Sequence, residues 1–279
     1  MQSWESTIIQ VRKNKEFEDL VYHSYLEEDL IKNVERYRTS EEFKEINRYL
    51  KSYGLNSGRI LDIGSGNGIT TISFALLGYE VHACEPDDSE TVGCRAIEYL
   101  RNKYSLGNKV TIHNCIAEEL NTSMEFDLVF SRQAMHHAND LDSFINNTTK
   151  RLKQGGIFFS VRDHVLNDES QLNEFLQSHP LQKYYGGENA YTKRRYIQAL
   201  KTAGFSKIKC IEFDESVINY YPLKQEDIRK KSQKITRRIR NKIGFTTPLV
   251  MSILLRFSKS LKYQKYQNGR MISFISSKN

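Results

Sequence analysis

The pattern of apolar and polar positions divides the chain into a helical N-terminal part and an alternating central part. In residues 5–52, apolar side chains recur three or four positions apart among dense charges, which predicts amphipathic helices. Ser40 stands where an N-cap would open a further helix before Phe43 and Ile46. We therefore expect an N-terminal helical cap over residues 1–53.

From Arg59 onward, short apolar runs alternate with segments of helical periodicity. Strands are predicted at RILDI (59–63), EVHACE (80–85), KVTIHNC (109–115), FDLVFS (126–131), GIFFSVR (156–162), KIKCIEF (207–213) and RMISFIS (270–276). Helices are expected near 70–79, 89–105, 140–153 and 192–203. Repeated βα units predict an α/β fold with a seven-stranded, mostly parallel sheet, helices on both faces and ligands at the carboxyl ends of the strands.

The domain organisation expected from this pattern is one main domain with additions. The central domain would cover residues 54–213, a helical insertion would follow over 214–268, and residues 269–279 would return the last strand to the sheet. The chain has 279 residues, of which 39% are hydrophobic, enough to bury a substantial core. With no long uncharged apolar run and no leader pattern at the start, the expected location is the cytoplasm.

The charge distribution changes this picture only at the C-terminal end, and the cysteine content does not change it. Residues 201–279 hold 18 Lys and Arg against 5 Asp and Glu, so the net charge of +7 originates there. Such an asymmetry favours an acidic partner. The four cysteines are scattered without the two-residue spacing of metal or redox sites, so the sequence assigns no metal.

A glycine cluster between the first central strand and its helix predicts a nucleotide-type site. Gly64, Gly66 and Gly68 follow the strand directly, where backbone without side chains can turn sharply and approach a ligand. The spacing is GxGxG, and the carboxylate of Asp62 suits an ammonium group better than a pyrophosphate. Glu85, at the end of the second strand, can accept hydrogen bonds from ribose hydroxyls. Together these residues indicate an adenosine ligand with a cationic amino-acid end.

With these elements, residues 55 to 165 resemble the class I S-adenosylmethionine (SAM)-dependent methyltransferases, in particular the small-molecule group related to the ubiquinone and menaquinone methyltransferases. The matching segments are DIGSGNG (62–68), EPD (85–87), AEEL (117–120) and FDLVFSRQAMHHA (126–138). The resemblance implies a Rossmann-like domain, SAM as cofactor and transfer of its methyl group.

The resemblance also implies how the cofactor is held. Asp62 and Gly64 would hold the methionine part, Glu85 the ribose, and the segment from Ile116 to Glu118 the adenine. Ile116 is a departure, because many relatives carry Asp there. The cofactor-binding residues expected in full are Asp62, Gly64, Ser65, Gly66, Gly68, Glu85, Pro86, Ile116, Ala117, Glu118 and Ser131.

The acceptor is expected above the carboxyl ends of the fourth and fifth central strands. Arg132, His136 and His137 follow one strand, and Asp163 and His164 follow the other. A hydroxyl acceptor must lose a proton, so a His137 or His164 base oriented by Asp163 is one hypothesis. The alternatives are that His137 only lines the cofactor site and that residues 162–165 are a structural strand end.

A polar and aromatic stretch, His179 to Tyr191, provides further candidates. Its Gly186-Gly187 pair allows backbone bends, so the stretch could form a lid over the acceptor. The substrate-binding candidates on this lid are Tyr184, Tyr185, Glu188 and Tyr191. The alternative is that Asn189 caps the following helix and the tyrosines pack on the surface.

Residues 228–257 form the basic part of the insertion. Isoleucines at helical spacing among Lys and Arg predict a basic amphipathic helix over 228–243, followed by the apolar segment PLVMSILLRF (248–257). Contact with an anionic membrane and binding of nucleic-acid phosphates both fit this composition. A solvated helix packed on the core or on a second subunit fits it equally.

Three functions follow from the sequence. The first is methylation of a small-molecule or lipid-linked acceptor, such as a sugar or quinone-like hydroxyl. The second is methylation of RNA or DNA through the basic insertion, and the third is SAM binding without catalysis. The acceptor atom and the oligomeric state are not fixed by the sequence.

Overall fold

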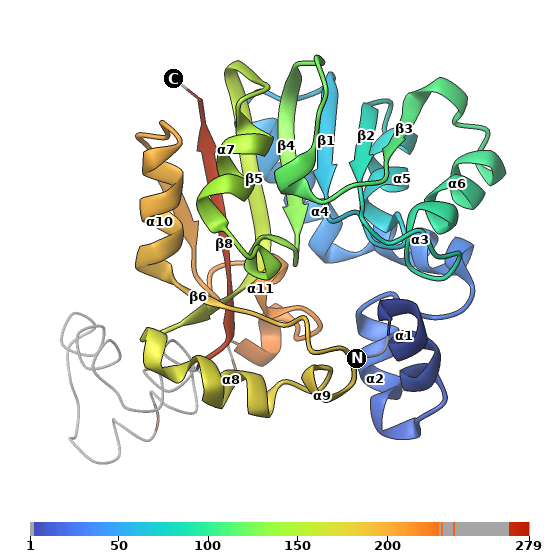
Figure 1. The fold of residues 1–279 in the computed structure, drawn as a ribbon, viewed down its shortest axis with the longest axis vertical. Coiled ribbons are helices and arrows are strands. Elements are labelled where there is room, and N and C mark those ends of the chain that lie inside the picture. Colours follow the sequence, from blue (N-terminus) through green and yellow to red (C-terminus); the bar gives the residue numbers. More distant parts are fainter. Residues whose placement is uncertain (1–2, 229, 231–236, 238–267, 279) are drawn as a thin grey trace.

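The computed structural model describes residues 3–228, 230, 237 and 268–278 as a sheet with helices on both faces (Figure 1). Almost all of the predicted basic helix at 228–243, and all of the apolar segment at 248–257, lie outside the described residues. The expected membrane or nucleic-acid contact through these segments therefore stays a prediction.

The sheet has eight strands in the order β3-β2-β1-β4-β5-β8-β7, with β6 pairing with β5. The strands are β1 (Arg59–Ile63), β2 (Glu80–Cys84), β3 (Val110–His113), β4 (Phe126–Arg132), β5 (Leu152–Leu166), β6 (Tyr191–Thr192), β7 (Ile208–Ile211) and β8 (Arg270–Ser277). Strands β1 to β5 are parallel, whereas β8 runs antiparallel to β5 and β7. The predicted mostly parallel sheet of seven strands is confirmed, and the two-residue β6 is added to it.

Helices cover both faces of this sheet. The α-helices are α1 (Trp4–Arg12), α2 (Glu18–His23), α3 (Leu30–Thr39), α4 (Glu41–Ser52), α5 (Ile69–Leu76), α6 (Cys94–Lys103), α7 (Leu141–Thr149), α8 (Leu172–Ser178), α9 (Gln182–Tyr185), α10 (Lys193–Thr202) and α11 (Val217–Tyr220). Helices α3 to α6 and α11 pack on one face, and α7 and α10 pack on the other. Within the described part of the chain, every helix is too short or too polar to cross a lipid bilayer.

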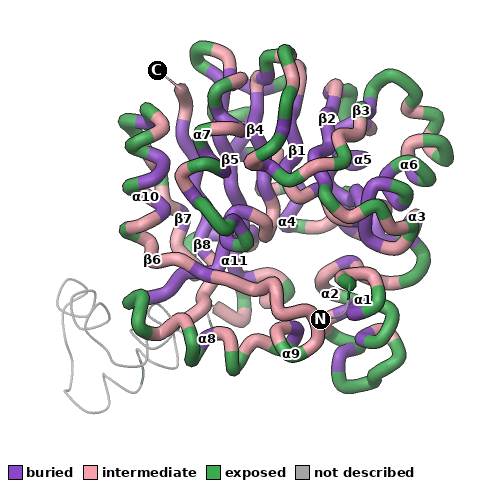
Figure 2. The backbone as a smooth tube through the Cα atoms, in the orientation of Figure 1, coloured by how far each residue is buried: buried purple, intermediate pink, exposed green. Residues whose placement is uncertain are grey.

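Alternation along the central strands builds the two halves of the core. Phe130 and Phe159 face the layer of α3 to α5, whereas Val129 and Phe158 face α7 and α10. Both faces of a parallel sheet are covered, which explains why the central strands are almost uniformly buried (Figure 2).

The predicted N-terminal cap divides into two parts. Helices α3 and α4 belong to the main core, and the ring of Tyr49 lies 5.9 Å from that of Phe159 on β5. Helices α1 and α2 instead form a separate small cluster with Leu181, just before α9. Residues 30–52 are therefore a layer of the central domain, and only α1 and α2 stand apart from it.

Strand β5 continues beyond its predicted end at residue 162. Its pairing with β8 shifts register between Ser160 and Asp163, and Arg162 within the shift has φ +62°, in the left-handed region. A bulge re-aims side chains without ending a strand. The alternative that residues 162–165 form a structural strand end agrees with their place in β5, where Asp163, His164 and Val165 pair with β8. The bulge changes the direction in which the side chains of Asp163 and His164 point.

The inclusion of α4 in the core gives a stability prediction. Ile46 is fully buried, so Ile46→Ala should lower the free energy of unfolding by about 2–5 kcal/mol in urea denaturation. Ile9 on α1 is 40% exposed, and Ile9→Ala should change it by under about 0.5 kcal/mol. Equal effects of the two variants would contradict the assignment of α4 to the core.

Candidate active site

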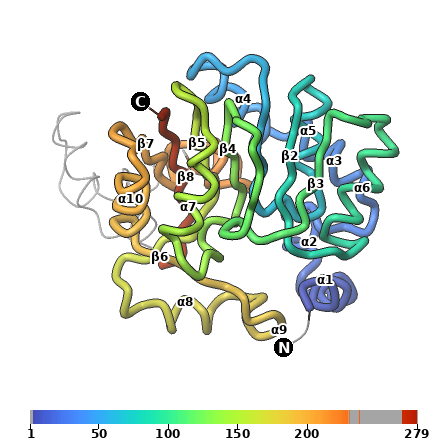
Figure 3. Tube along the Cα trace, turned by 45° about the horizontal axis from the view of Figure 1, so that its top comes forward, coloured from blue at the N-terminus to red at the C-terminus, as the bar shows by residue number. Residues whose placement is uncertain are grey.

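A cavity of about 1080 Å³ opens at the carboxyl ends of the parallel strands. Its walls come from the loops after β1, β2, β3 and β4, from the end of β5, and from α1, α2, α11 and the segment around α9. Helices α1, α8 and α9 lie beyond this edge of the sheet (Figure 3). This volume exceeds the roughly 300–1,000 Å³ typical of a single ligand site.

The glycine turn forms one wall and needs its glycines for two different reasons. Gly64 has φ +65°, and a Cβ there would lie 2.4 Å from the Cβ of Ala134. Gly66 has φ +55°, and a Cβ there would meet no atom within 4 Å. Gly64 therefore permits close packing of two loops, whereas Gly66 leaves space on the cavity wall.

Asp62 lies beneath this turn, and only one of its two carboxylate oxygens has hydrogen-bond partners. Its Oδ2 accepts hydrogen bonds of 2.6 Å from the hydroxyls of both Thr70 and Thr71, while its buried Oδ1 has no partner. Burial raises the pKa of Asp62 to about 6, against the lowering effect of the two hydroxyls. A buried carboxylate oxygen without a donor suits a cationic ligand group.

Glu85 ties the glycine turn to the loop after β2. Its carboxylate accepts the backbone N–H of Gly66 at 2.7 Å and that of Asp87 at 3.0 Å. Burial raises the pKa of Glu85 to about 7, and the two backbone hydrogen bonds oppose this rise. The carboxylate is held at the cavity wall with lone pairs left for further donors.

Most of the predicted cofactor residues line the cavity. These are Gly64, Ser65, Gly66, Glu85, Pro86, Ile116, Ala117 and Glu118. Ile116, where many relatives of the resembled family carry Asp, is 41% exposed and offers only an apolar surface. Asn147 on α7 holds the turn at 117–119 by donating to the carbonyls of Ala117 and Leu120.

Three predicted cofactor residues, Asp62, Gly68 and Ser131, are not among the residues that line the cavity. Gly68 is the N-cap of α5, and a Cβ there would lie 3.0 Å from Ile97, so it serves the packing of α5 on α6. Ser131 is fully buried inside the sheet between β1 and β5. We correct the assignments of Gly68 and Ser131 to structural roles, because neither residue is open to the cavity.

The acceptor candidates that line the cavity are Arg132, His136, His137, His164, Tyr185 and Glu188. Arg132 is not free for a substrate, because its guanidinium makes a bidentate pair with Glu42 of α4 at 2.8 and 3.1 Å. The Glu42 side chain is fully buried. No sequence signal marked this partner, since Glu42 is one of several acidic residues opening a helix.

Asp163 orients His136, not the predicted His137 or His164. Its Oδ1 lies 3.0 Å from both the backbone nitrogen and the ring Nδ1 of His136, and its Oδ2 accepts from Ser160. The bulge at Arg162 turns the carboxylate toward the loop after β4, which explains the correction. Burial raises the pKa of Asp163 to about 7 and lowers that of His136.

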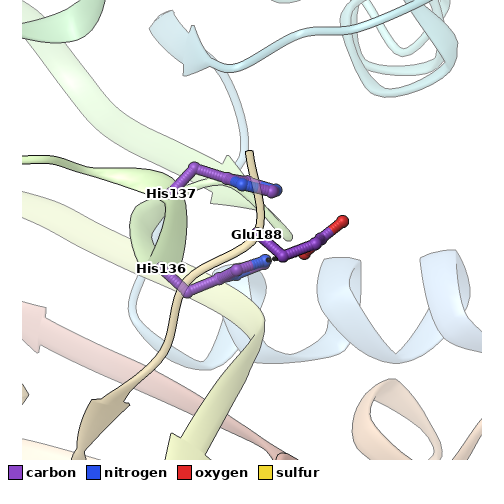
Figure 4. Close-up of side chains that lie close together, drawn as sticks. All are labelled: His136, His137 and Glu188. Carbon is purple, nitrogen blue, oxygen red and sulfur yellow. Dashed lines mark ion pairs between the residues drawn. The ribbon is translucent and has the colours of Figure 1, made fainter. Parts of the chain in front are cut away.

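The other two histidines donate from Nδ1 to backbone carbonyls. His137 Nδ1 lies 2.8 Å from the oxygen of Gly187, and His164 Nδ1 lies 2.7 Å from that of Gly269. A carbonyl only accepts, so in the neutral rings Nε2 carries the lone pair. His136, His137 and Glu188 approach one another from the loop after β4 and the segment after α9 (Figure 4).

Two tyrosines of the predicted lid face other parts of the molecule. Tyr184 packs edge-on against Phe17 in the cluster of α1 and α2, and Tyr191 donates to the carbonyl of Ala138 while packing on Tyr196. Their assignment to substrate binding is corrected accordingly. The alternative for Asn189 is also wrong, because Thr192 caps α10.

Arg162 also lines the cavity, although no sequence pattern predicted that it contacts a ligand. Its buried guanidinium donates to the carbonyls of Ile218 at 2.8 Å and Tyr221 at 3.1 Å, and its Nε has no partner. Among the described residues, no carboxylate forms a salt bridge with it. Burial lowers its pKa, the charge of Glu42 opposes this effect and that of Arg132 adds to it, and an anion in the cavity would relieve the cost of burial.

These features fit SAM. Asp62 is buried beneath the glycine turn, and its unpaired Oδ1 would suit an ammonium group placed against that turn. The space before Gly66 admits a close ligand, and Glu85 can accept from ribose hydroxyls. When bound, SAM would supply a methyl group on a cationic sulfur as the electrophile.

The sequence profile of a family described as a methyltransferase domain matches residues 22–209. The chain belongs to this family. It is a SAM-dependent methyltransferase, which confirms the expected class of enzyme and its cofactor. Membership of this family favours catalysis over the alternative of SAM binding without catalysis.

Individual relatives agree with this assignment. The chain is 29% identical over 102 residues to a ubiquinone biosynthesis O-methyltransferase of Paramagnetospirillum magneticum, covering 37% of this chain and 39% of that protein. It is 26% identical over 135 residues to the protein of the same name from Pelagibacter ubique, covering 48% and 49%. The matches thus span half or less of these relatives' lengths.

A solved structure supports the fold. Phosphoethanolamine N-methyltransferase 2 of Haemonchus contortus, in complex with SAM, superposes with a TM-score of 0.54 at 22% identity. The superposition covers 85% of this chain and 52% of that one. The present chain therefore shares the Rossmann-like fold of that enzyme, as the sequence predicted.

Gly66→Ala should weaken SAM binding more than it weakens the fold. The new methyl group would project from the cavity wall and cost about 1–3 kcal/mol of binding free energy, about 5- to 150-fold in affinity by calorimetry. Gly54→Ala is the matched control, since Gly54 has φ +85° and open space but lies before β1. Both variants should lose about 1–2 kcal/mol of folding stability. Unchanged affinity in Gly66→Ala would exclude this wall from the SAM site.

SAM affinity should fall as the pH is lowered through about 7. The ionised Glu85 is a stronger acceptor for hydroxyls than its protonated form, so with a pKa of about 7 the Kd should rise by up to about tenfold from pH 8 to pH 6. Glu85→Gln should bind more weakly and lose this part of the pH dependence. Calorimetry on both proteins separates Glu85 from the titration of SAM itself, and parallel profiles would refute the role of Glu85.

Proposed function

We propose that this methyltransferase transfers the methyl group of SAM to a hydroxyl oxygen of a small-molecule or lipid-linked acceptor, such as a sugar or a quinone-like ring. The observation that carries the proposal is a single cavity with two chemically different ends. Gly66 and Glu85 line one end, and His136, His137 and His164 line the other.

The volume of the cavity supports a two-ligand site. At about 1080 Å³ it has room for an acceptor beside the cofactor. Methyl transfer is an in-line displacement, so holding both reactants in one enclosed space supplies much of the rate enhancement. The protein must then position the acceptor and remove the proton of its hydroxyl group.

The imidazoles at the acceptor end support a hydroxyl as the reacting group. His137 and His164 present Nε2 lone pairs that can accept a hydrogen bond from an O–H group. Asp163 is a positioning residue, because it reaches the acceptor end only through His136.

Arg162 supports an acceptor that also carries an anionic group. Its guanidinium lines the same cavity and forms no salt bridge among the described residues. A carboxylate or phosphate of the acceptor would therefore neutralise its charge. The similarity to ubiquinone biosynthesis O-methyltransferases favours oxygen as the acceptor atom. Methylation of nucleic acid would draw on the basic residues 228–243, which lie mostly outside the described residues.

The test is a transfer assay with methyl-labelled SAM. The acceptor panel should pair hydroxybenzoates, sugars and prenylated phenols with matched compounds that lack the carboxylate or phosphate. We expect label in an ether linkage, with the anionic member of a pair preferred. Label in an amine, at carbon or in added RNA, and none in any hydroxyl compound, would refute the proposal.

The control variant for this assay is Glu85→Gln. It lowers SAM affinity but leaves the acceptor end intact, so raising the SAM concentration should restore its turnover. A turnover that stays low at saturating SAM would mean that Glu85 acts on the acceptor as well.

A further inference from the structure

The acceptor end of the cavity contains a cluster of imidazoles around a nearly buried carboxylate. Glu188 has a side chain only 6% exposed, with Oε2 3.9 Å from His136 Nε2 and Oε1 3.6 Å from His179 Nδ1. Among the described residues, no Lys or Arg forms a salt bridge with it. The charged or chargeable groups nearest to this carboxylate are therefore the two imidazoles.

We propose that His136, His137 and Glu188 bind a divalent transition-metal ion of the zinc type through the two Nε2 atoms and the carboxylate. The three candidate ligand atoms lie within 4.8 Å of one another. Zinc–nitrogen bonds of 2.0–2.1 Å in a tetrahedron place ligand atoms about 3.3 Å apart, so side-chain movements of the order of 1 Å would close the site. Figure 4 shows the three side chains converging from two separate segments.

The second ring nitrogen of each histidine is already fixed as a metal site requires. His136 Nδ1 faces the Asp163 carboxylate at 3.0 Å, and His137 Nδ1 donates to the Gly187 carbonyl at 2.8 Å. Metal-bound histidines nearly always place their other nitrogen on a carboxylate or a backbone carbonyl, which fixes the tautomer and aims Nε2 at the ion. Both partners are present on this chain.

The ligand set selects the class of metal. Two imidazoles and one carboxylate suit zinc and ferrous iron more than magnesium or calcium, which prefer oxygen ligands. Three protein ligands leave at least one position open, as in catalytic zinc sites. All three ligand residues line the cavity, so the open position is accessible to an acceptor.

The use of such an ion rests on the proposed function. A hydroxyl bound to a zinc-type ion loses its proton to water near neutral pH, which would supply the reactive oxygen that weakly basic imidazoles cannot. The binding of the ion itself does not depend on what the acceptor is.

The test is a titration of tag-free protein, stripped with a chelator and dialysed, with Co²⁺ followed by visible absorption and displaced by Zn²⁺. We expect one ion per chain. Glu188→Gln and His137→Gln should each weaken binding by at least about 100-fold, and Asp163→Asn, which acts through His136, by about 10–100-fold. SAM binding by each variant shows that it is folded.

Matched controls lie on the same chain. Glu174 is exposed on α8, and His113 stacks on His82 between β2 and β3, so Glu174→Gln and His113→Gln should bind Co²⁺ as the unaltered protein does. The proposal is overturned if the unaltered protein binds no stoichiometric ion. It is also overturned if a folded Glu188→Gln binds as tightly as the control variants. Metal binding together with failure of all hydroxyl acceptors would remove only the proposed function.

Discussion

The carboxylate of Asp163 holds the ends of β4 and β5 in one arrangement. It bonds the backbone and the ring of His136 after β4, and it accepts from Ser160 within its own strand. These bonds lie in the fully buried interior, where an unpaired carboxylate would cost several kcal/mol. The loop after β4 is consequently held against the bulge in β5, and every group at the acceptor end takes its position from this junction.

Backbone strain is concentrated at the same junction. Gln133 and Arg162 both have positive φ values, and the Gln133 N–H donates to the carbonyl of Val161 at 2.9 Å. Non-glycine residues in this region cost roughly 1–3 kcal/mol each and persist only where the surroundings enforce them. Here the strain aims Arg162 and the histidine loop into one cavity, which connects the local backbone to the chemistry of methyl transfer.

The residues of the two ends of the cavity differ in how far apart they lie in the sequence. The SAM end is assembled from a turn and strand ends that follow one another closely, with Glu85 bonded to Gly66. The acceptor end joins His136 to Glu188 and to Asp163, and its wall includes α11 and the α1–α2 pair.

The sequence by itself determined the alternation of strands and helices, the glycine turn and the position of Glu85. Local periodicity fixes βα units, and the right-handed crossover then leaves few possible sheets. It also predicted that His136, His137 and Glu188 belong to one site. Only the tertiary structure decided that Asp163 pairs with His136, that Glu42 neutralises Arg132, and that Tyr184 and Tyr191 pack elsewhere. These outcomes depend on a bulge and on contacts between residues far apart in the chain, and neither hydrophobic periodicity nor motif spacing carries information about them.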